Sequence, residues 1–402
     1  MNEQFFRKAG FHGYNADDVN AYIVATDAKI REMNDANASA LADVTEKLER
    51  SEKLLETVNA TNEALQNTLK EKNDECAALH AEKEEYLSAA TNIYKFLDKC
   101  TDSDGRMFFI VSKEGVPIQK RRYFFSETFA AIGCAQYYKI TKNEKAWEDA
   151  KKYFDMACRV FYNNELTTPK FTNTNLKALS PIMIMLSTAQ VMASVGIDSE
   201  KYKDTAKDMA QRIIKGGFFN TDLGALLENV SEDGSFCDTP TGRLVNPGHS
   251  LEAAWFLMYE GCLSGNKEII DVGKQIIDFT MPRGLDKKHG GIIAFTDVLG
   301  KPATALEWDM KLWWPQCEAI IANKMAYMLF GDEKYNDNYK MLCDYAFKNF
   351  ADKENNEWYG YLHYDNTPST YIKGNIFKGP FHLPRMLMIL VELDSLGSIE
   401  KI

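Results

Sequence analysis

Two histidines stand among polar and aromatic residues in separate parts of the chain. His249 lies within 246–256, with a glutamate three positions later, and His382 lies within 378–385, with an arginine three positions later. An imidazole titrates near neutral pH, so both histidines are candidates for proton transfer. The alternative for His249 is that it merely caps or packs at the start of a helix.

The other four histidines are weaker candidates. His289 precedes two glycines and His363 lies within Tyr-Leu-His-Tyr, so we expect both to be structural or loop residues, while His80 falls in a polar helix and His12 in a turn. No His-x-His or His-x-x-x-His spacing supports a metal site. The sequence therefore predicts neither a metal nor a cofactor.

Further polar and aromatic residues gather at the same helix starts. Glu252 would share a helix face with His249, where its carboxylate could orient the imidazole, hold a hydroxyl group or simply sit as a helix-start charge. Arg122 and Arg385 are candidates to stabilise a developing oxyanion. Aromatic walls with a few converging polar groups suit a sugar. The remaining candidate substrate contacts are Trp314, Glu318, Glu228, Asn229 and Lys311.

The composition of the chain limits the classes of ligand and function that these residues can have. The chain has 402 residues, a hydrophobic fraction of 45% and a net charge of -11, which argues against nucleic acid because no basic cluster is present. The eight cysteines form no Cys-x-x-Cys pair, and neither a signal peptide nor a membrane-spanning run is recognisable. A cytoplasmic protein with reduced thiols is the expectation.

Two regions of different composition meet near residue 90. Residues 1–90 hold 18 acidic and 10 basic side chains, a net charge of -8, and contain neither Pro nor Trp; residues 91–402 hold all 11 Pro and all 6 Trp. Within 36–90, apolar residues recur at alternating spacings of three and four, which predicts a coiled coil. Asn62 falls at a core position of this repeat and favours a homodimer. A single solvated helix is the alternative.

Residues 91–402 follow a helical period with alternating short and long loops. Paired helices with the long loops on one side predict an all-α toroid. The candidate helices lie near 124–140, 144–161, 177–194, 199–215, 249–263, 267–280, 312–330, 334–350 and 379–396, and the end of the long helix near 90–100 makes about ten.

The N-terminal stretch 5–23 combines aromatic and basic residues with Gly-Tyr-Asn, two acidic residues and Val-Asn. It resembles the N-terminal module of DivIVA-like bacterial cell-division proteins, which implies a module over 1–35 leading into a parallel coiled coil. The resemblance makes a membrane surface or a cell-division protein a candidate partner through 5–23, with Arg7, Lys8, Phe11 and His12 exposed. The alternative is a dimer cap without a partner.

Residues 107–385 carry a second resemblance. Pro-Gly-His-x-x-Glu at 247–252, Trp-Trp-Pro-x-x-Glu at 313–318, Phe-His-x-Pro-Arg at 381–385 and the stretch 122–127 resemble the N-acylglucosamine 2-epimerase family. The resemblance implies an (α/α)6-type barrel over 91–402 and interconversion of N-acylglucosamine and N-acylmannosamine, so a small amino sugar is the expected ligand. His249 and His382 match the catalytic pair of that family.

One departure from the family pattern bears on activity. The family has about 80 further barrel residues before the part that matches Met107, with an arginine stretch that helps to form the sugar site, and the acidic coil stands there instead. We therefore expect a barrel that lacks its first helical hairpin, closed by the coil or by a second subunit, or else an impaired site. The alternatives are a non-catalytic sugar-binding scaffold and a glycosidase with Glu252 and Glu318 as its carboxylate pair.

Overall fold

The structure is a computed structural model, and it describes residues 22–24, 26, 70, 72, 75, 79, 81–121, 123–163 and 175–396. The chain divides into two compact units, one over Asn20–Asp98 and the other containing Lys99–Ile402. Nearly all of the DivIVA-like module and most of the coiled-coil segment lie outside the described residues. Those two predictions, and the homodimer, remain predictions.

The described end of the first unit is a helix over 81–96, and a 3-10 turn at Leu97–Cys100 follows it. Leu79, Tyr86 and Ile93 follow one another at intervals of seven residues and are 45%, 40% and 54% exposed. Apolar side chains at heptad spacing form a single stripe on a helix. This stretch of the predicted seam therefore presents large apolar side chains to solvent.

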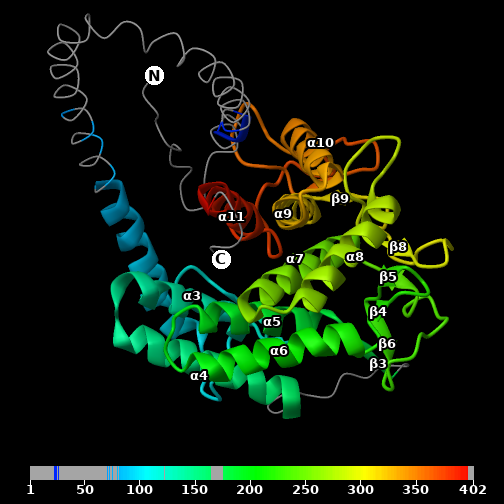
Figure 1. The fold of residues 1–402 in the computed structure, drawn as a ribbon. Coiled ribbons are helices and arrows are strands. Elements are labelled where there is room, and N and C mark those ends of the chain that lie inside the picture. Colours follow the sequence, from blue (N-terminus) through cyan, green and yellow to red (C-terminus); the bar gives the residue numbers. More distant parts are fainter. Residues whose placement is uncertain are drawn as a thin grey trace, which may run out of the picture. The chain divides into compact units, whose positions relative to one another are not determined.

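The second unit is built from helical hairpins (Figure 1). Helices α3 and α4, α5 and α6, α7 and α8, and α9 and α10 pack in pairs, while α3, α5, α7, α9 and α11 contact one another in succession. The odd-numbered helices thus form an inner layer covered by the even-numbered ones. The bounds are α3 Phe125–Thr141, α4 Glu144–Asn163, α5 Ser180–Ala193, α6 Ser199–Lys215, α7 Pro247–Ser264, α8 Lys267–Gly284, α9 Trp313–Phe330, α10 Glu333–Asn349 and α11 His382–Leu396.

Apolar patterning separates the two layers. Helix α6 buries a single stripe that includes Tyr202, Ala206, Met209 and Ile213, with charged residues elsewhere, as expected for an outer helix. Helix α7 buries most of its length, with residues 250–258 buried without interruption. A helix that is apolar on all sides belongs inside a protein. The sequence therefore specifies the layers directly.

Short turns join each inner helix to the outer helix that follows. Helix α7 ends at Gly265, whose φ of 66° is left-handed, and Asn266 then accepts two amide hydrogen bonds as the N-cap of α8. Gly331 (φ 65°) and the N-cap Asp332 repeat this arrangement between α9 and α10. Glycine tolerates the left-handed conformation, and Asn or Asp satisfies the first free amides of the next helix.

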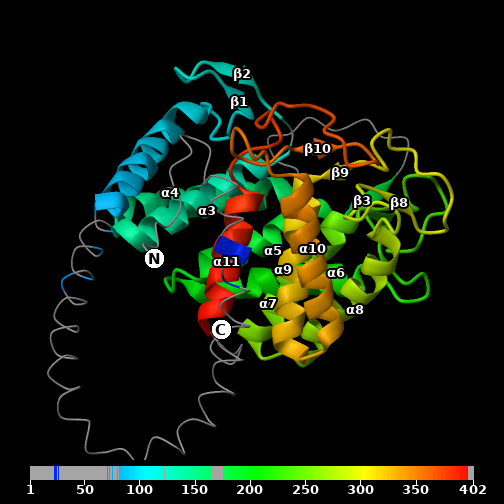
Figure 2. The same cartoon turned by 90° about the horizontal axis from the view of Figure 1, so that it is seen from above.

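Long loops return the chain from each outer helix to the next inner one and carry short antiparallel strand pairs. The pairs are β1–β2, β3–β6, β4–β5, β7–β8 and β9–β10, and Figure 2 shows β9 and β10 at one end of α9 and α10. The strands are β1 Ile110–Val111, β2 Pro117–Gln119, β3 Leu176–Ala178, β4 Phe219–Asn220, β5 Ala225–Leu226, β6 Asn229–Ser231, β7 Leu244–Val245, β8 Thr296–Asp297, β9 Lys311–Leu312 and β10 Tyr361–Leu362.

The predicted all-α toroid is confirmed. Each predicted helix from 124–140 onward has its counterpart, and the long loops lie where the N-termini of inner helices begin. The described residues between 99 and 396 form nine α-helices, and α3 and α11 stand at the two ends of the inner row. Among the described helices, none combines the length and the apolar character that crossing a membrane requires.

Candidate active site

The first turns of three inner helices bring most of the predicted site residues together. Helices α7, α9 and α11 all begin at the end of the barrel where the long loops lie, and their amino ends favour negative charge there. We call the resulting group the site cluster. Its members are Glu228, His249, Glu252, Trp314, Glu318, His382 and Arg385.

His249 is held in place from two sides. Its backbone amide donates to the side chain of the N-cap Asn246 at 3.1 Å, and its Nδ1 lies 2.9 Å from Glu228 Oε1. Glu228 directly precedes β6, and its own carbonyl accepts the Leu179 amide, so the carboxylate comes from a fixed loop. Burial alone would lower the pKa of His249, but the charge and hydrogen bond of Glu228 more than offset it and raise that pKa.

His382 has a different partner set. Its Nδ1 lies 2.8 Å from Glu318 Oε1, and that same oxygen accepts from Arg385 Nη2 at 2.7 Å. Trp255 Nε1 donates to the other Glu318 oxygen at 2.8 Å. Burial alone would raise the pKa of Glu318, but Arg385 and the hydrogen bonds hold it well below its ordinary value. Glu318 is therefore a buried carboxylate that stays ionised.

Arg385 joins the two halves of the cluster. Its Nη2 donates to Glu252 Oε1 at 2.5 Å as well as to Glu318, and its guanidinium carbon lies 4.5 Å from the centre of the Phe381 ring. The nearby Glu318 and Glu252 carboxylates outweigh burial and raise the pKa of Arg385, so it keeps its charge throughout the physiological range.

The Trp314 ring lies close to both histidines. Its ring centre is 5.1 Å from that of His249 and 5.6 Å from that of His382, with tilts of 40° and 36°. The neighbouring Trp313 is 3% exposed and belongs to the core. Within the described part of the chain, Nε2 of neither imidazole has a hydrogen-bond partner. The cluster thus offers two imidazole Nε2 atoms without a described partner, both close to one indole.

The acidic groups of the cluster also resemble a metal-ligand set. Glu252, Glu318 and His382 have ligand atoms within 4.8 Å of one another. The Arg385 guanidinium already bridges the two carboxylates of this set. A fixed cation at this position neutralises the carboxylates without a metal ion, and the arrangement is that of a positioned ion network.

Two of the predicted contacts, Lys311 and Asn229, lie outside the site cluster. Lys311 is fully buried, donates to Asp286 Oδ2 at 2.6 Å and to the Tyr364 carbonyl, and so ties two loops together. Asn229 donates from Nδ2 to the Thr241 carbonyl at 3.2 Å. Arg122 lies outside the described residues.

Of the readings that the sequence left open for Glu252, contact with the His249 imidazole is made by Glu228 instead, and the sequence did not single out Trp255. The carboxylate that contacts His249 is Glu228, whereas Glu252 holds Arg385. Trp255 donates to Glu318. Its spacing of three residues from Glu252 on one helix face was the available signal.

Comparisons with known proteins identify the family of this chain. Residues 76–378 match the model of the family described as N-acylglucosamine 2-epimerase (GlcNAc 2-epimerase). The N-acylglucosamine 2-epimerase of Rattus norvegicus is 32% identical over 295 residues, which cover 71% of this chain and 69% of the rat protein.

Solved structures show the same fold. A D-mannose isomerase aligns with a TM-score of 0.68 and 19% identity over 79% of this chain and 83% of the other. The cellobiose 2-epimerase of Bacillus thermoamylovorans B4167 aligns with a TM-score of 0.68 and 21% identity over 77% and 82%. These are (α/α)6 barrels, and the fold predicted from the sequence is confirmed. The chain belongs to the N-acylglucosamine 2-epimerase family and is a carbohydrate epimerase or isomerase.

Proposed function

We propose that this protein interconverts an N-acylglucosamine and the corresponding N-acylmannosamine at C2, with His249 and His382 as the two proton-transfer groups. The observation that carries the proposal is the placement of both imidazoles against Trp314, each anchored through Nδ1 to a carboxylate and open at Nε2. The family match supports this choice of sugar, since the rat relative is an N-acylglucosamine 2-epimerase.

The reaction requires the open-chain sugar, in which C2 lies next to the C1 aldehyde. One imidazole takes the C2 proton, and the electron pair of the broken C–H bond forms the C1=C2 double bond while the C1 oxygen becomes negative. The second imidazole then gives a proton to the opposite face of C2 as the C1 carbonyl re-forms. Imidazole suits both steps, because the ordinary pKa of this type of side chain lies near neutrality.

The unequal surroundings of the histidines assign their starting states. The carboxylate of Glu228 supports a positive charge on His249, so His249 begins as the proton donor. His382 shares Glu318 with Arg385, whose Nη2 lies 3.3 Å from the Nδ1 of His382. Because the reaction needs one proton donor and one base, His382 takes the role of base, and the roles exchange in the reverse direction.

Arg385 stabilises the negative charge that develops on the C1 oxygen, and Glu252 holds Arg385 in place. Arg385 Nε is buried and has no hydrogen-bond partner among the described residues, while Nη2 is fixed by two carboxylates. A guanidinium held in place before reaction stabilises a developing oxyanion without reorganisation. Glu252 acts as a positioning residue that orients it.

A substrate panel tests the choice of sugar. Purified full-length protein is incubated separately with N-acetylmannosamine, mannose and cellobiose, and products are followed by proton NMR. We expect N-acetylglucosamine from N-acetylmannosamine at a rate about fivefold above turnover of either other sugar, since an added amide contact contributes on the order of 1 kcal/mol. Faster turnover of cellobiose or mannose would contradict the amino-sugar assignment while leaving the reaction class intact.

We also propose that the chain forms a homodimer through its coiled coil. Supporting this are the seam predicted over 36–90 and the exposed Leu79, Tyr86 and Ile93 at heptad spacing. The test is sedimentation of the full chain and of a Tyr86→Lys/Ile93→Lys variant, with Glu84→Lys as the charge-matched control away from the stripe. We expect a dimer that the double variant alone weakens. A monomeric parent chain at micromolar concentration would contradict the proposal.

A further inference from the structure

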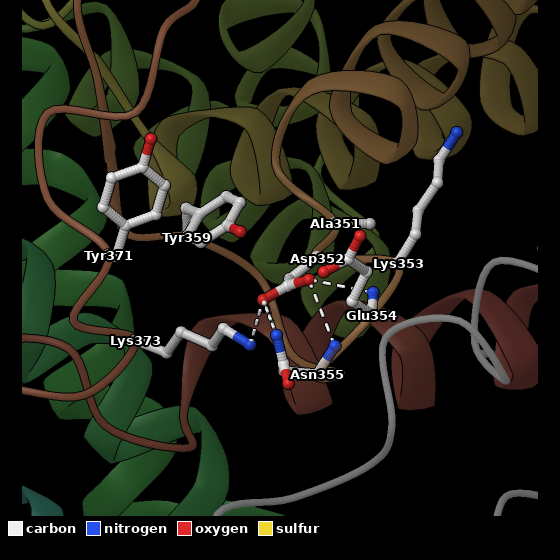
Figure 3. A pocket seen from close by; sticks show the side chains of 8 residues that line it. All are labelled: Ala351, Asp352, Lys353, Glu354, Asn355, Tyr359, Tyr371 and Lys373. Carbon is white, nitrogen blue, oxygen red and sulfur yellow. Dashed lines mark hydrogen bonds and ion pairs between the residues drawn. The ribbon is translucent and has the colours of Figure 1, made fainter.

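An open hollow lies outside the site cluster, in the loops that connect α10 to α11 (Figure 3). Two tyrosines form one side of it, with ring centres 5.7 Å apart and planes at 84°. Tyr371 is 75% exposed, so its ring is available to a ligand. Asp352, Asn355 and Lys373 lie beside Tyr359 in the figure, and Lys373 Nζ is 5.7 Å from the centre of the Tyr359 ring. The hollow belongs to loops at the same end of the barrel as the site cluster.

The floor of the hollow is an internally satisfied ion pair. Lys373 Nζ lies 2.5 Å from Asp352 Oδ2 and donates to the Asn356 carbonyl at 2.6 Å. The other oxygen of Asp352 accepts the amides of Glu354 and Asn355 at 2.9 and 3.1 Å. Burial alone would raise the pKa of Asp352, but Lys373 and these amides lower it well below its usual range. The floor is therefore rigid and permanently paired.

The charges that line the hollow cancel. Asp352 and Glu354 supply two negative charges, and Lys353 and Lys373 supply two positive ones. The hydroxyl of Tyr371 and the Oδ1 of Asn355 have no hydrogen-bond partner among the described residues. A neutral ligand with many hydroxyl groups and an apolar face matches such walls, whereas an ion gains nothing from them.

We propose that this hollow is a second, non-catalytic binding site for a neutral saccharide, which stacks on Tyr371 and hydrogen-bonds to Asn355. Its volume, about 650 Å³, falls within the range of small-molecule sites. None of the eight lining residues is a member of the site cluster. The site would hold a sugar unit at the rim of the barrel, beside the loop that leads to His382.

A ligand that cannot react separates this site from catalysis. Methyl β-cellobioside has no free aldehyde form, and its binding to the full chain is measured by saturation-transfer NMR titration. The variant is Tyr371→Ala, and the matched control is Ile372→Ala, since Ile372 is 63% exposed on the same loop but does not line the hollow. In parallel, kcat and KM for N-acetylmannosamine are determined for each protein.

We expect Tyr371→Ala to weaken binding of the glycoside about three- to tenfold, the range expected for loss of one aromatic contact. Ile372→Ala should bind like the parent chain, and neither variant should change kcat or KM. Equal binding by the Tyr371 and Ile372 variants would overturn the proposal, because the hollow would then take no saccharide. A parallel loss of kcat/KM in Tyr371→Ala would also overturn it, because the hollow would then be part of the catalytic site.

Discussion

Two of the regions that hold buried charges in this protein, the site cluster and the loops around Lys311, differ in how completely those charges are paired. In the site cluster, Arg385 and His382 share the carboxylate of Glu318, yet Arg385 Nε and the imidazole Nε2 have no partner among the described residues. In the loops, the ammonium of Lys311 is enclosed between Asp286 and a backbone carbonyl. The site cluster thus keeps polar atoms that no described residue pairs, whereas the ammonium of Lys311 is fully enclosed.

This difference in pairing distinguishes buried charges that stabilise the fold from buried charges that can act on a ligand, a distinction that burial alone does not make. A fully paired ion fixes two chain segments relative to each other, and removing one partner leaves an uncompensated charge. A partly paired ion is fixed in position and still has donors to offer to a reacting group. The comparison therefore predicts opposite effects of mutation, on stability in the loops and on turnover in the site cluster.

The largest effect is expected for His249→Ala or His382→Ala. Each removes one of the two proton-transfer groups, so turnover of N-acetylmannosamine should fall by about 10²–10⁴. Each histidine side chain is partly exposed, 26% and 22%, so the circular dichroism spectrum and the urea midpoint should change little. The control is His363→Ala, an exposed loop histidine. Near-normal turnover in both site variants would show that the assigned pair is wrong.

Lys311→Met should show the reverse pattern. The variant leaves Asp286 charged, 3% exposed and without its ammonium partner, which costs about 3–5 kcal/mol of unfolding free energy. Turnover by the protein that remains folded should stay within about twofold of the parent. The double variant Asp286→Asn/Lys311→Met should recover part of the loss in urea unfolding. A stable Lys311→Met protein with impaired turnover would place Lys311 with the site cluster after all.

Of the site-cluster variants, Glu228→Gln should have the smallest effect on activity, and that effect should appear in the pH dependence of kcat/KM. Glu228 raises the pKa of His249, so its removal lowers that pKa. His249 must carry its proton to act as the donor, and the alkaline limb of the kcat/KM profile should therefore move to lower pH. Glu260→Gln is the control, because that buried carboxyl lies near the other end of α7 and bonds to Gln190. An unmoved alkaline limb would contradict the donor role of His249.

Much of the fold could be predicted from the sequence, because the residues that end helices and the apolar patterns that separate inner from outer helices indicate the same arrangement. The apolar residues along α7 predict a buried helix, and the structure has one there. Gly265 and Gly331 fall between predicted helices, and they cap the ends of α7 and α9. The predicted starts of some helices differ from the observed ones by a few residues where Pro lies in the first turn, as at Pro247. The helical period locates the apolar part of a helix, and it does not locate the residues that begin the first turn.

The site was predictable only in part, because residue type does not reveal partners. His249, Glu318 and Arg385 could be found from their motifs, but the pairing of His249 with Glu228 depends on how the loop before β6 folds over α7. Lys311 shows the opposite case, since its neighbours in sequence suggested a substrate contact. Its actual partner, Asp286, lies 25 residues away on another loop.

The most direct measurement of the central claim is proton NMR of N-acetylmannosamine with the full-length protein in deuterated water. Proton transfer at C2 by two side chains that exchange with solvent predicts N-acetylglucosamine that carries deuterium at C2, with His249→Ala and His382→Ala as inactive controls. Product that retains the original C2 proton throughout, formed at the same rate, would contradict the two-histidine account. So would an absence of any conversion by folded protein.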